Sequence, residues 1–340
     1  MMKTIIAMRA FLLMSTLALT ACATKNTPAT GSRIEEASFV TIGGIQQWIT
    51  VRGANRKNPV LLLIHGGPAD PQSALVELYV PYERDFVLVQ WDQRGAGKTF
   101  APNRETVKEL TLERMAQDGV EVVEYLRKHL GQKQIIVLGH SWGSMLATEM
   151  VLRKPELFSA YVGTGQVSSW SASTAAQWSH LRAAATAAND KETLDRMAVI
   201  GEPDPFNATQ YFSWRNIMNR KYLAAADAAW LQSLRTMASS RFTDAERKDL
   251  GDSSNFSAIQ LMKVLMTTDL NATAKRIPIP YYVIQGRDDL YTPTAPAIEY
   301  FNNVQAPRKE LVIIEGAGHF AMCTHQSEFL QALEKVKRSR

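Results

Sequence analysis

The sequence predicts an α/β protein in which a doubly wound, mostly parallel β-sheet carries an inserted helical cap. The first observation is a series of short apolar runs, which are typical of strands buried on both faces of a parallel sheet. The second is that helical patterns alternate with these runs over residues 60–165 and again over 278–338. The third is the stretch 167–276, which is rich in Ala, Met and Trp and has no strand pattern.

The expected strands follow from the apolar runs and from the residues that bound them. An antiparallel pair is expected within residues 42–51, where Gly43-Gly44 interrupts the pattern. Residues 60–64 form a continuous apolar run bounded by Pro59 and Gly66, which predicts a fully buried strand. Runs of the same kind span residues 86–91, 134–138, 281–285 and 310–314.

Helices are expected where apolar residues recur at helical spacing. Residues 112–130 carry such a stripe, and Thr111 can cap the start of the helix. Residues 141–153 follow a strand directly and end before Pro155. The inserted stretch holds three segments with helical character: 173–188, 210–220 and 224–238. An insertion between two halves of a parallel sheet lies over the carboxyl ends of the strands, where ligands bind in this class of fold, so it predicts a cap or lid.

The N-terminus predicts an export signal rather than part of the fold. Lys3 and Arg9 precede a mostly apolar run, residues 10–19, which is about half of the roughly 20 residues that a spanning helix needs. The run ends in Leu19-Thr20-Ala21-Cys22, which resembles the bacterial lipobox and implies acylation of Cys22. We therefore expect a lipid-anchored protein of the bacterial cell envelope, at the outer membrane and facing the periplasm. The alternative is a soluble periplasmic or secreted protein.

These observations predict the organisation of the whole chain. The expected parts are a signal peptide (1–21), a lipidated tether (22–33), the first part of the core (34–166), the cap (167–276) and the second part of the core (277–340).

Composition excludes some functions and some means of stabilisation. The formal net charge is +5, and the basic residues form no cluster, so the sequence gives no case for nucleic-acid binding. The chain has two cysteines. If Cys22 carries lipid, Cys323 has no partner and no internal disulfide is expected. We interpret Cys323 as a structural thiol rather than a nucleophile.

The strongest chemical signal is Gly139-His140-Ser141-Trp142-Gly143, which fits G-x-S-x-G between a predicted strand and a predicted helix. This arrangement is typical of the nucleophile elbow of α/β-hydrolases, where small residues on both sides allow a tight turn that exposes the serine oxygen. The helix that follows favours developing negative charge at its N-terminus. The sequence therefore predicts Ser141 as a nucleophile.

A nucleophilic serine requires a base, and the base requires an acid that orients it. His319 follows the last predicted strand, where this fold places the base. Two adjacent acids, Asp288 and Asp289, follow the penultimate strand, and the G-x-x-D-x-x-x-P spacing favours Asp289. The chain order Ser141, Asp289, His319 is the order of α/β-hydrolases.

An oxyanion hole is expected beside the serine. His65-Gly66-Gly67-Pro68 follows a predicted strand, and a glycine-rich turn there can present a backbone N–H. Gly67 is one candidate donor and Trp142 is the other. The alternative is that these residues form a tight turn with a purely structural role.

The same motifs resemble the proline iminopeptidase branch of the α/β-hydrolases. His65 to Pro68 is similar to the HGGPG motif of that branch, residues 92–97 to its DQRGxG turn, and residues 139–144 to its GGSWGS elbow. The resemblance is specific over about residues 60–160 and 278–320. It implies release of an N-terminal residue, often proline, from short peptides, without a metal or cofactor. Two positions depart from the pattern, since Ala69 and His140 each replace a glycine.

The cap departs further from this branch. Its peptidases bind the free α-amino group with acidic cap residues, one of them in a W-x-x-W-E run, whereas residues 230–234 here contain no acid. Glu202, Asp204 and Asp227 could substitute, although a position on a helix or loop surface is the expectation for each. The candidate substrate-binding residues of the cap are Trp214, Trp230 and Glu202.

These observations predict a serine hydrolase that cleaves an amide or ester bond through an acyl-enzyme on Ser141, most like a prolyl aminopeptidase acting on short peptides. The alternative within this chemistry is a carboxylesterase or lactonase acting on small apolar esters. A more remote alternative is a non-catalytic binding protein on the same scaffold. Epoxide hydrolases and haloalkane dehalogenases share the fold but place an aspartate at the elbow, so Ser141 argues against them.

Overall fold

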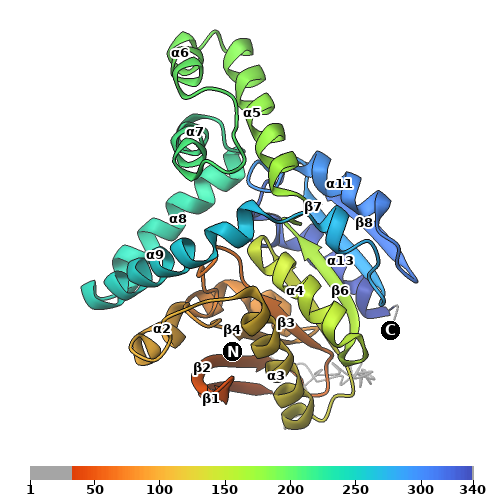
Figure 1. Ribbon diagram of the computed structural model, residues 1–340. Coiled ribbons are helices and arrows are strands. Elements are labelled where there is room, and N and C mark those ends of the chain that lie inside the picture. The colour runs from red at the N-terminus through yellow and green to blue at the C-terminus, as the bar shows by residue number, and fades with distance from the viewer. Residues whose placement is uncertain (1–32, 339–340) are drawn as a thin grey trace, which may run out of the picture. The chain divides into compact units, whose positions relative to one another are not determined.

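The computed structural model describes residues 33–338 of the chain (Figure 1). The predicted signal peptide and Cys22 lie outside the described residues. No helix within residues 33–338 has both the length and the apolar character that crossing a membrane requires.

Within the described residues, eight strands form one sheet in the order β1-β2-β4-β3-β5-β6-β7-β8. The first two strands form an antiparallel hairpin, β2 pairs antiparallel with β4, and every later pairing is parallel. The chain therefore builds a mostly parallel sheet that grows outward in both directions from β3, as the sequence predicts. The strands are β1 (Ile34–Ile42), β2 (Ile45–Gly53), β3 (Val60–Ile64), β4 (Val87–Trp91), β5 (Ile135–His140), β6 (Phe158–Thr164), β7 (Tyr281–Gly286) and β8 (Lys309–Ile314).

The strands expected from apolar runs are confirmed to within two residues at either end. The N-terminal pair differs, because β1 begins at Ile34 rather than at residue 42. Polar residues interrupt its sequence and most of its positions are exposed, so it lacks the apolar run by which the other strands are found. The Gly43-Gly44 turn is where the sequence predicts a break, and both glycines have positive φ (55° and 78°). β6 is a further strand, which was not predicted separately.

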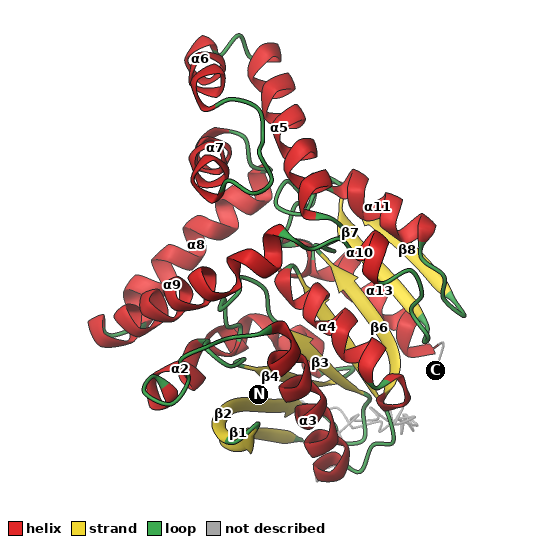
Figure 2. Ribbon diagram, in the orientation of Figure 1, coloured by secondary structure: helices red, strands yellow, loops and turns green. Residues whose placement is uncertain are grey.

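Helices cover both faces of the sheet (Figure 2). α3 (Leu112–Leu130) has the predicted bounds, and the hydroxyl of Thr111 accepts a hydrogen bond from the Arg114 N–H at its start. α3 and α4 (Trp142–Arg153) pack on one face, and α13 (Gln326–Arg338) packs on the other. The remaining helices of the core are α1 (Val80–Glu83), α2 (Gly97–Asn103), α10 (Leu270–Thr273), α11 (Thr294–Asn303) and α12 (Ala321–Thr324), with 3-10 turns at Ser73–Tyr79 and Pro155–Leu157.

Alternation along β3 shows how the core is built. Val60, Leu62 and Ile64 pack into the layer that contains α3 and α4. Leu61 and Leu63 pack into the layer that contains α13. All five are almost completely buried, which explains why the strand is apolar at every position. Burial of each such side chain stabilises the fold by about 1.5 to 3 kcal/mol relative to exposure.

The segment between β6 and β7 is helical, and in this part of the chain the structure contains no strand. Figure 1 shows its helices, coloured green to cyan, beyond the carboxyl end of β6. We refer to residues 170–266 as the cap; they lie within the insertion that the sequence predicts. Its helices are α5 (Trp170–Ala187), α6 (Lys191–Ile200), α7 (Ala208–Lys221), α8 (Ala225–Arg241) and α9 (Asp244–Met266). A small apolar core holds α5, α6 and α7 together; it consists of Trp178, Leu181, Met197, Tyr211, Trp214 and Ile217.

Candidate active site

Ser141 occupies a strained turn between β5 and α4. Its φ and ψ are 55° and −124°, a backbone conformation that residues with a side chain rarely adopt. The turn is possible because its flanking residues are glycines. A Cβ on Gly143 would lie 2.1 Å from the carbonyl oxygen of Ile64, and one on Gly139 would lie 2.6 Å from the carbonyl oxygen of Gly143. Both glycines of the motif are therefore required by backbone contacts.

The side chains of His319 and Asp289 form a buried pair. His319 Nδ1 lies 2.9 Å and 3.1 Å from the two carboxylate oxygens of Asp289. The carboxylate also accepts hydrogen bonds from the Gln285 amide, from the N–H groups of Tyr291 and Thr292, and from the Thr292 hydroxyl. These donors fix the carboxylate in place. With Nδ1–H donating to Asp289, the neutral imidazole leaves Nε2 as an acceptor.

Asp288, the competing acid, has an exposed side chain and is not part of this pair. The backbone explains the difference: the Asp288 N–H donates to Ala317 O, and the turn at 287–292 then directs the next carboxylate inward. The structure thus brings Asp289, and not Asp288, to His319.

Ser141 and the imidazole of His319 both contact the backbone at the end of β6. The Ser141 N–H donates to Thr164 O at 3.0 Å, and Gly165 follows immediately. A Cβ on Gly165 would lie 2.8 Å from His319 Cε1, so the ring packs directly against this backbone. Among the residues that the structure describes, no hydrogen bond joins the Ser141 hydroxyl to His319. Such bonds are often long in enzymes without substrate and shorten in the reacting complex.

Two backbone N–H groups adjoin the serine. Trp142 is the first residue of α4, where N–H groups have no partner within the helix. Gly67 has a φ of 114°, and its N–H donates to no other described residue. Ala69, which replaces a glycine of the related motif, has a φ of 64°, so the turn keeps a left-handed residue without the usual glycine.

Two buried histidines support this region. The Nε2 of His65 accepts from the Gln93 N–H, and His140 Nε2 lies 3.1 Å from His319 O. Burial lowers the pKa of His65 to about 4 and that of His140 to about 3. Both remain neutral at physiological pH, so they hold loops rather than transfer protons.

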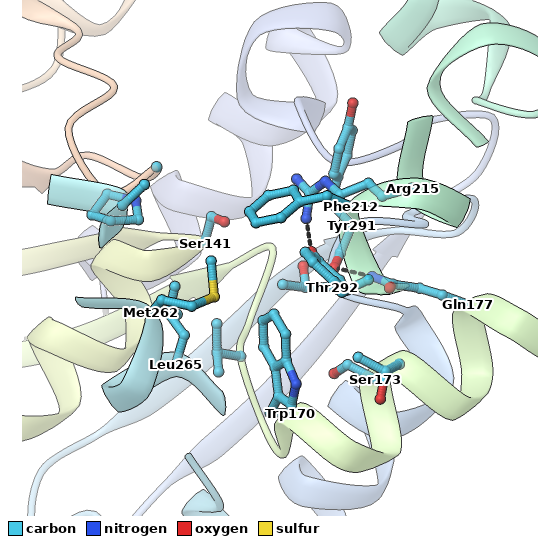
Figure 3. Close-up of a pocket in the computed structure, with 16 residues that line it drawn as sticks. Ser141, Trp170, Ser173, Gln177, Phe212, Arg215, Met262, Leu265, Tyr291 and Thr292 are labelled. Atoms are coloured by element: carbon cyan, nitrogen blue, oxygen red, sulfur yellow. Dashed lines mark hydrogen bonds between the residues drawn. The ribbon is translucent and has the colours of Figure 1, made fainter. Parts of the chain in front are cut away.

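A cavity of about 190 Å³ opens in front of Ser141 (Figure 3). One side is formed by the core, through Ser141, Gly67 and Thr292, and the other by the cap. The cap residues include aromatic rings and one cation, Arg215, and no carboxylate of the described residues lines the cavity. The cap side consists of Trp170, Ser173, Thr174, Gln177, Tyr211, Phe212, Arg215, Ala258, Met262 and Leu265.

Comparison with known proteins decides the family. Residues 59–326 match the family described as the alpha/beta hydrolase fold. The chain belongs to this family.

Relatives of this α/β hydrolase include peptidases. It is 25% identical over 303 residues to the probable aminopeptidase YbaC of Bacillus subtilis, covering 88% of this chain and 95% of that protein. A proline iminopeptidase of Saccharolobus solfataricus is 22% identical over 291 residues, covering 84% and 86%. A proline iminopeptidase-related protein of Thermus thermophilus has a similar fold, with a TM-score of 0.63 at 17% identity over 89% and 97% of the chains. These likenesses support a hydrolase resembling the proline iminopeptidases, as the motifs predict.

The three cap residues expected to bind substrate do not line the cavity at Ser141. Trp214 is buried in the apolar core of the cap, where its ring packs against that of Tyr211. Glu202 is exposed in the loop between α6 and α7. Trp230 lines a different cavity, of about 170 Å³, together with Asp70. Large aromatic residues of a helical insertion can pack its own core or line a site, and the sequence does not distinguish these roles.

Asp227 also departs from expectation, since the sequence analysis placed it on a surface. It is 1% exposed, and its carboxylate accepts hydrogen bonds from the backbone N–H groups of His319 (2.6 Å) and Phe320 (3.2 Å). Desolvation raises the pKa of Asp227 above its ordinary value. A cap helix, α8, is thereby joined to the loop that carries His319. Asp204 lies on a loop, as expected.

Sequence reasoning missed several residues of the site in this α/β hydrolase. Thr292 could have been found, because it is the polar residue three positions after Asp289 in the same turn. Gln177, Arg215 and Tyr291 carry no signal, since each reaches the cavity only through the packing of cap helices and loops.

Within residues 33–338 we also considered metal ligands and the thiol of Cys323. No group of three or more histidine, cysteine or acidic side chains there could hold a metal ion. The thiol of Cys323 lies 3.4 Å from the Tyr79 hydroxyl, and burial raises its pKa to about 12. Such a thiol is a poor nucleophile near neutral pH.

Proposed function

We propose that this α/β hydrolase cleaves an amide or ester bond through an acyl-enzyme on Ser141. The observation that carries the proposal is the buried His319–Asp289 pair near a serine that is held in a strained turn and lines a cavity. A structural serine needs neither the strained backbone nor the orienting pair. This combination favours catalysis over a non-catalytic binding role on the same scaffold.

In the proposed mechanism, His319 Nε2 takes the proton of the Ser141 hydroxyl as its oxygen attacks the substrate carbonyl carbon. Asp289 holds the imidazole and stabilises the imidazolium that forms. The tetrahedral intermediate collapses, its bond to the leaving group breaks, and His319 returns the proton to that group. Water then attacks the acyl-enzyme by the same sequence and frees Ser141 with release of an acid.

The negative oxygen of the intermediate would be held by the N–H groups of Gly67 and Trp142. The Gly67 N–H has no acceptor among the described residues, and the Trp142 N–H is at the N-terminus of α4, whose dipole favours negative charge. Each donor of this kind is worth about 2.7 to 4 kcal/mol in the transition state.

For the substrate, we propose a short peptide or another small amide or ester. The peptidase-named relatives favour peptides. The lining of the cavity favours the alternative of a carboxylesterase or lactonase, because its described residues offer no acid to bind a free α-amino group. A cavity of about 190 Å³ suits a small acyl group in either case.

Labelling with a fluorophosphonate tests the nucleophile. The purified protein is expected to gain one adduct, which peptide mapping would locate on Ser141. Ser141→Ala should abolish labelling, whereas the exposed serine variant Ser240→Ala should label fully. A folded protein that is never labelled at Ser141 would sink the proposal. Rates on proline and alanine naphthylamides, compared with short p-nitrophenyl esters, then separate peptidase from esterase activity.

We further propose that acylated Cys22 anchors the protein in the cell envelope, on the strength of the sequence motif at residues 19–22. Growth of the producing bacterium with labelled palmitate tests this. The wild-type protein should take up label and fractionate with membranes. Cys22→Ser should take up none, and unlabelled wild-type protein in the soluble fraction would contradict the anchor.

A further inference from the structure

The cavity at Ser141 is lined by a cation, Arg215, that forms no salt bridge with the described residues. Arg215 projects from α7 into the cavity, as Figure 3 shows. No salt bridge involves Arg215 within the part of the chain that the structure describes. An arginine is effectively always charged, and a charge removed from water without a partner is costly.

The groups around Arg215 orient the guanidinium without neutralising it. Its Nη1 donates a hydrogen bond to the hydroxyl of Tyr211. Its Cζ lies 4.5 Å from the centre of the Tyr291 ring and 5.2 Å from that of Tyr211. Rings at these distances attract a cation and hold its plane. The other N–H donors of the fork have no acceptor among the described residues.

Two buried acids of the site, Asp289 and Asp227, have other hydrogen-bond partners. Asp289 is bonded to His319, and Asp227 is bonded to backbone N–H groups at 319 and 320. Desolvation lowers the pKa of Arg215 and outweighs the opposing electrostatic effects of Tyr291 and Asp289. Arg215 is therefore an oriented cation without a salt-bridge partner among the described residues, and it lines the same cavity as Ser141.

From this geometry we infer that the substrate carries a carboxylate, which Arg215 binds while Ser141 attacks the carbonyl. A planar guanidinium with unused donors matches a carboxylate through two parallel hydrogen bonds. Because the cavity is small and otherwise lined by apolar and neutral polar side chains, the carboxylate belongs to a short acyl compound or a short peptide. This inference rests on the proposed function and names its substrate class.

The carboxylate can come from either side of the bond that breaks, and matched substrates distinguish the two sources. For the acyl side, kcat/KM for 4-nitrophenyl hydrogen glutarate is compared with that for 4-nitrophenyl valerate, which has the same chain length and no charge. For the leaving group, prolylalanine is compared with its C-terminal amide. We expect the acid to be preferred on the order of tenfold to a hundredfold in at least one pair.

Substitutions assign the preference to Arg215. In Arg215→Gln the ratio of acid to neutral substrate should fall towards one. Arg215→Lys keeps the charge without the planar fork and should give an intermediate ratio. Arg220→Gln is the matched control, because Arg220 is exposed on the same helix; its ratio and activity should equal those of the wild type. Circular dichroism confirms that each variant is folded.

Several results would overturn the inference. One is a wild-type kcat/KM that is equal for the acid and the neutral substrate, or higher for the neutral one, in both pairs. Another is a preference for the acid that persists in Arg215→Gln. A third is a rate that depends only on a free amine in the substrate. If no substrate is turned over, glutarate is titrated into Ser141→Ala by calorimetry. Binding that Arg215→Gln removes then upholds the carboxylate site although the hydrolase proposal fails, and no binding refutes it.

Discussion

The two walls of the cavity at Ser141 are built in opposite ways. On the core wall, the groups proposed for chemistry stand at the ends of parallel strands, and Asp289 is held by hydrogen bonds from several donors. On the cap wall, helices contribute aromatic rings and Arg215, which forms no salt bridge with the described residues. The proposed catalytic groups are therefore positioned by the sheet and its loops, whereas most of the side chains that line the cavity come from the insertion.

Removal of the nucleophile should produce the largest effect and should act only on the core wall. In Ser141→Ala, kcat should fall by about 10⁶-fold, because no hydroxyl remains to form the acyl-enzyme. KM and the binding of glutarate should change little, since the cap wall is intact. Steady-state kinetics on the preferred ester measures this. A residual rate within about tenfold of the wild type would show that another group attacks the substrate.

The second prediction concerns the orienting acid. Asp289→Asn should lower kcat by about 10⁴-fold, because an amide cannot stabilise the imidazolium and favours the wrong tautomer of His319. Asp288→Asn is the control one residue away, and its exposed side chain should leave kcat unchanged. Equal losses in both variants would contradict the assignment of Asp289.

The contrast between the walls also explains what could be predicted from sequence. The elbow was predictable because its glycines are demanded by backbone contacts, which leave a short sequence pattern. Asp289 was predictable from its spacing within one turn. Each of these features depends on residues close together in the chain, next to a strand whose apolar run is plain.

The cap was predictable only as a helical segment. Whether Trp170 or Trp214 reaches the cavity depends on how α5 and α7 pack, and of these two the structure places Trp170 there. The roles of Arg215 and Asp227 depend on contacts with residues at 291 and at 319 and 320, far away in sequence. Local patterns carry no information about such contacts.

The third prediction tests the buried histidines of the core by pH. His140 has a pKa of about 3 when folded and about 6.5 when unfolded, so below about pH 6.5 only the unfolded chain takes up the proton. The free energy of unfolding should therefore fall with decreasing pH, by about 1.4 kcal/mol per unit for this residue. Asp92, whose pKa burial raises to about 6, acts in the opposite sense. The contribution of His140 is therefore measured as a difference between variants.

Urea unfolding at several pH values between about 5 and 6.5 gives that difference. His140→Gln can still donate to His319 O but does not titrate, so its free energy of unfolding should depend less steeply on falling pH than that of the wild type. His180→Gln, at an exposed position on α5, should keep the wild-type slope. Identical slopes in all three proteins would show that folding does not lower the pKa of His140.

The smallest expected effect lies where the two walls meet. Asp227 extends from α8 to the N–H groups of His319 and Phe320, so it acts on the imidazole only through the backbone that carries it. Asp227→Asn keeps a carbonyl acceptor but loses the charge-assisted bonds, which are worth about 1.5 to 3 kcal/mol. We expect kcat to fall about tenfold with KM for a neutral ester nearly unchanged. Asp195→Asn, which alters only an exposed pair with Lys191, should retain full activity.

If Asp227→Asn lowers the melting temperature but leaves kcat unchanged, α8 only stabilises the fold. If kcat falls alone, the cap takes part in positioning the proposed base, and the division between chemistry in the sheet and selectivity in the insertion is incomplete at this contact.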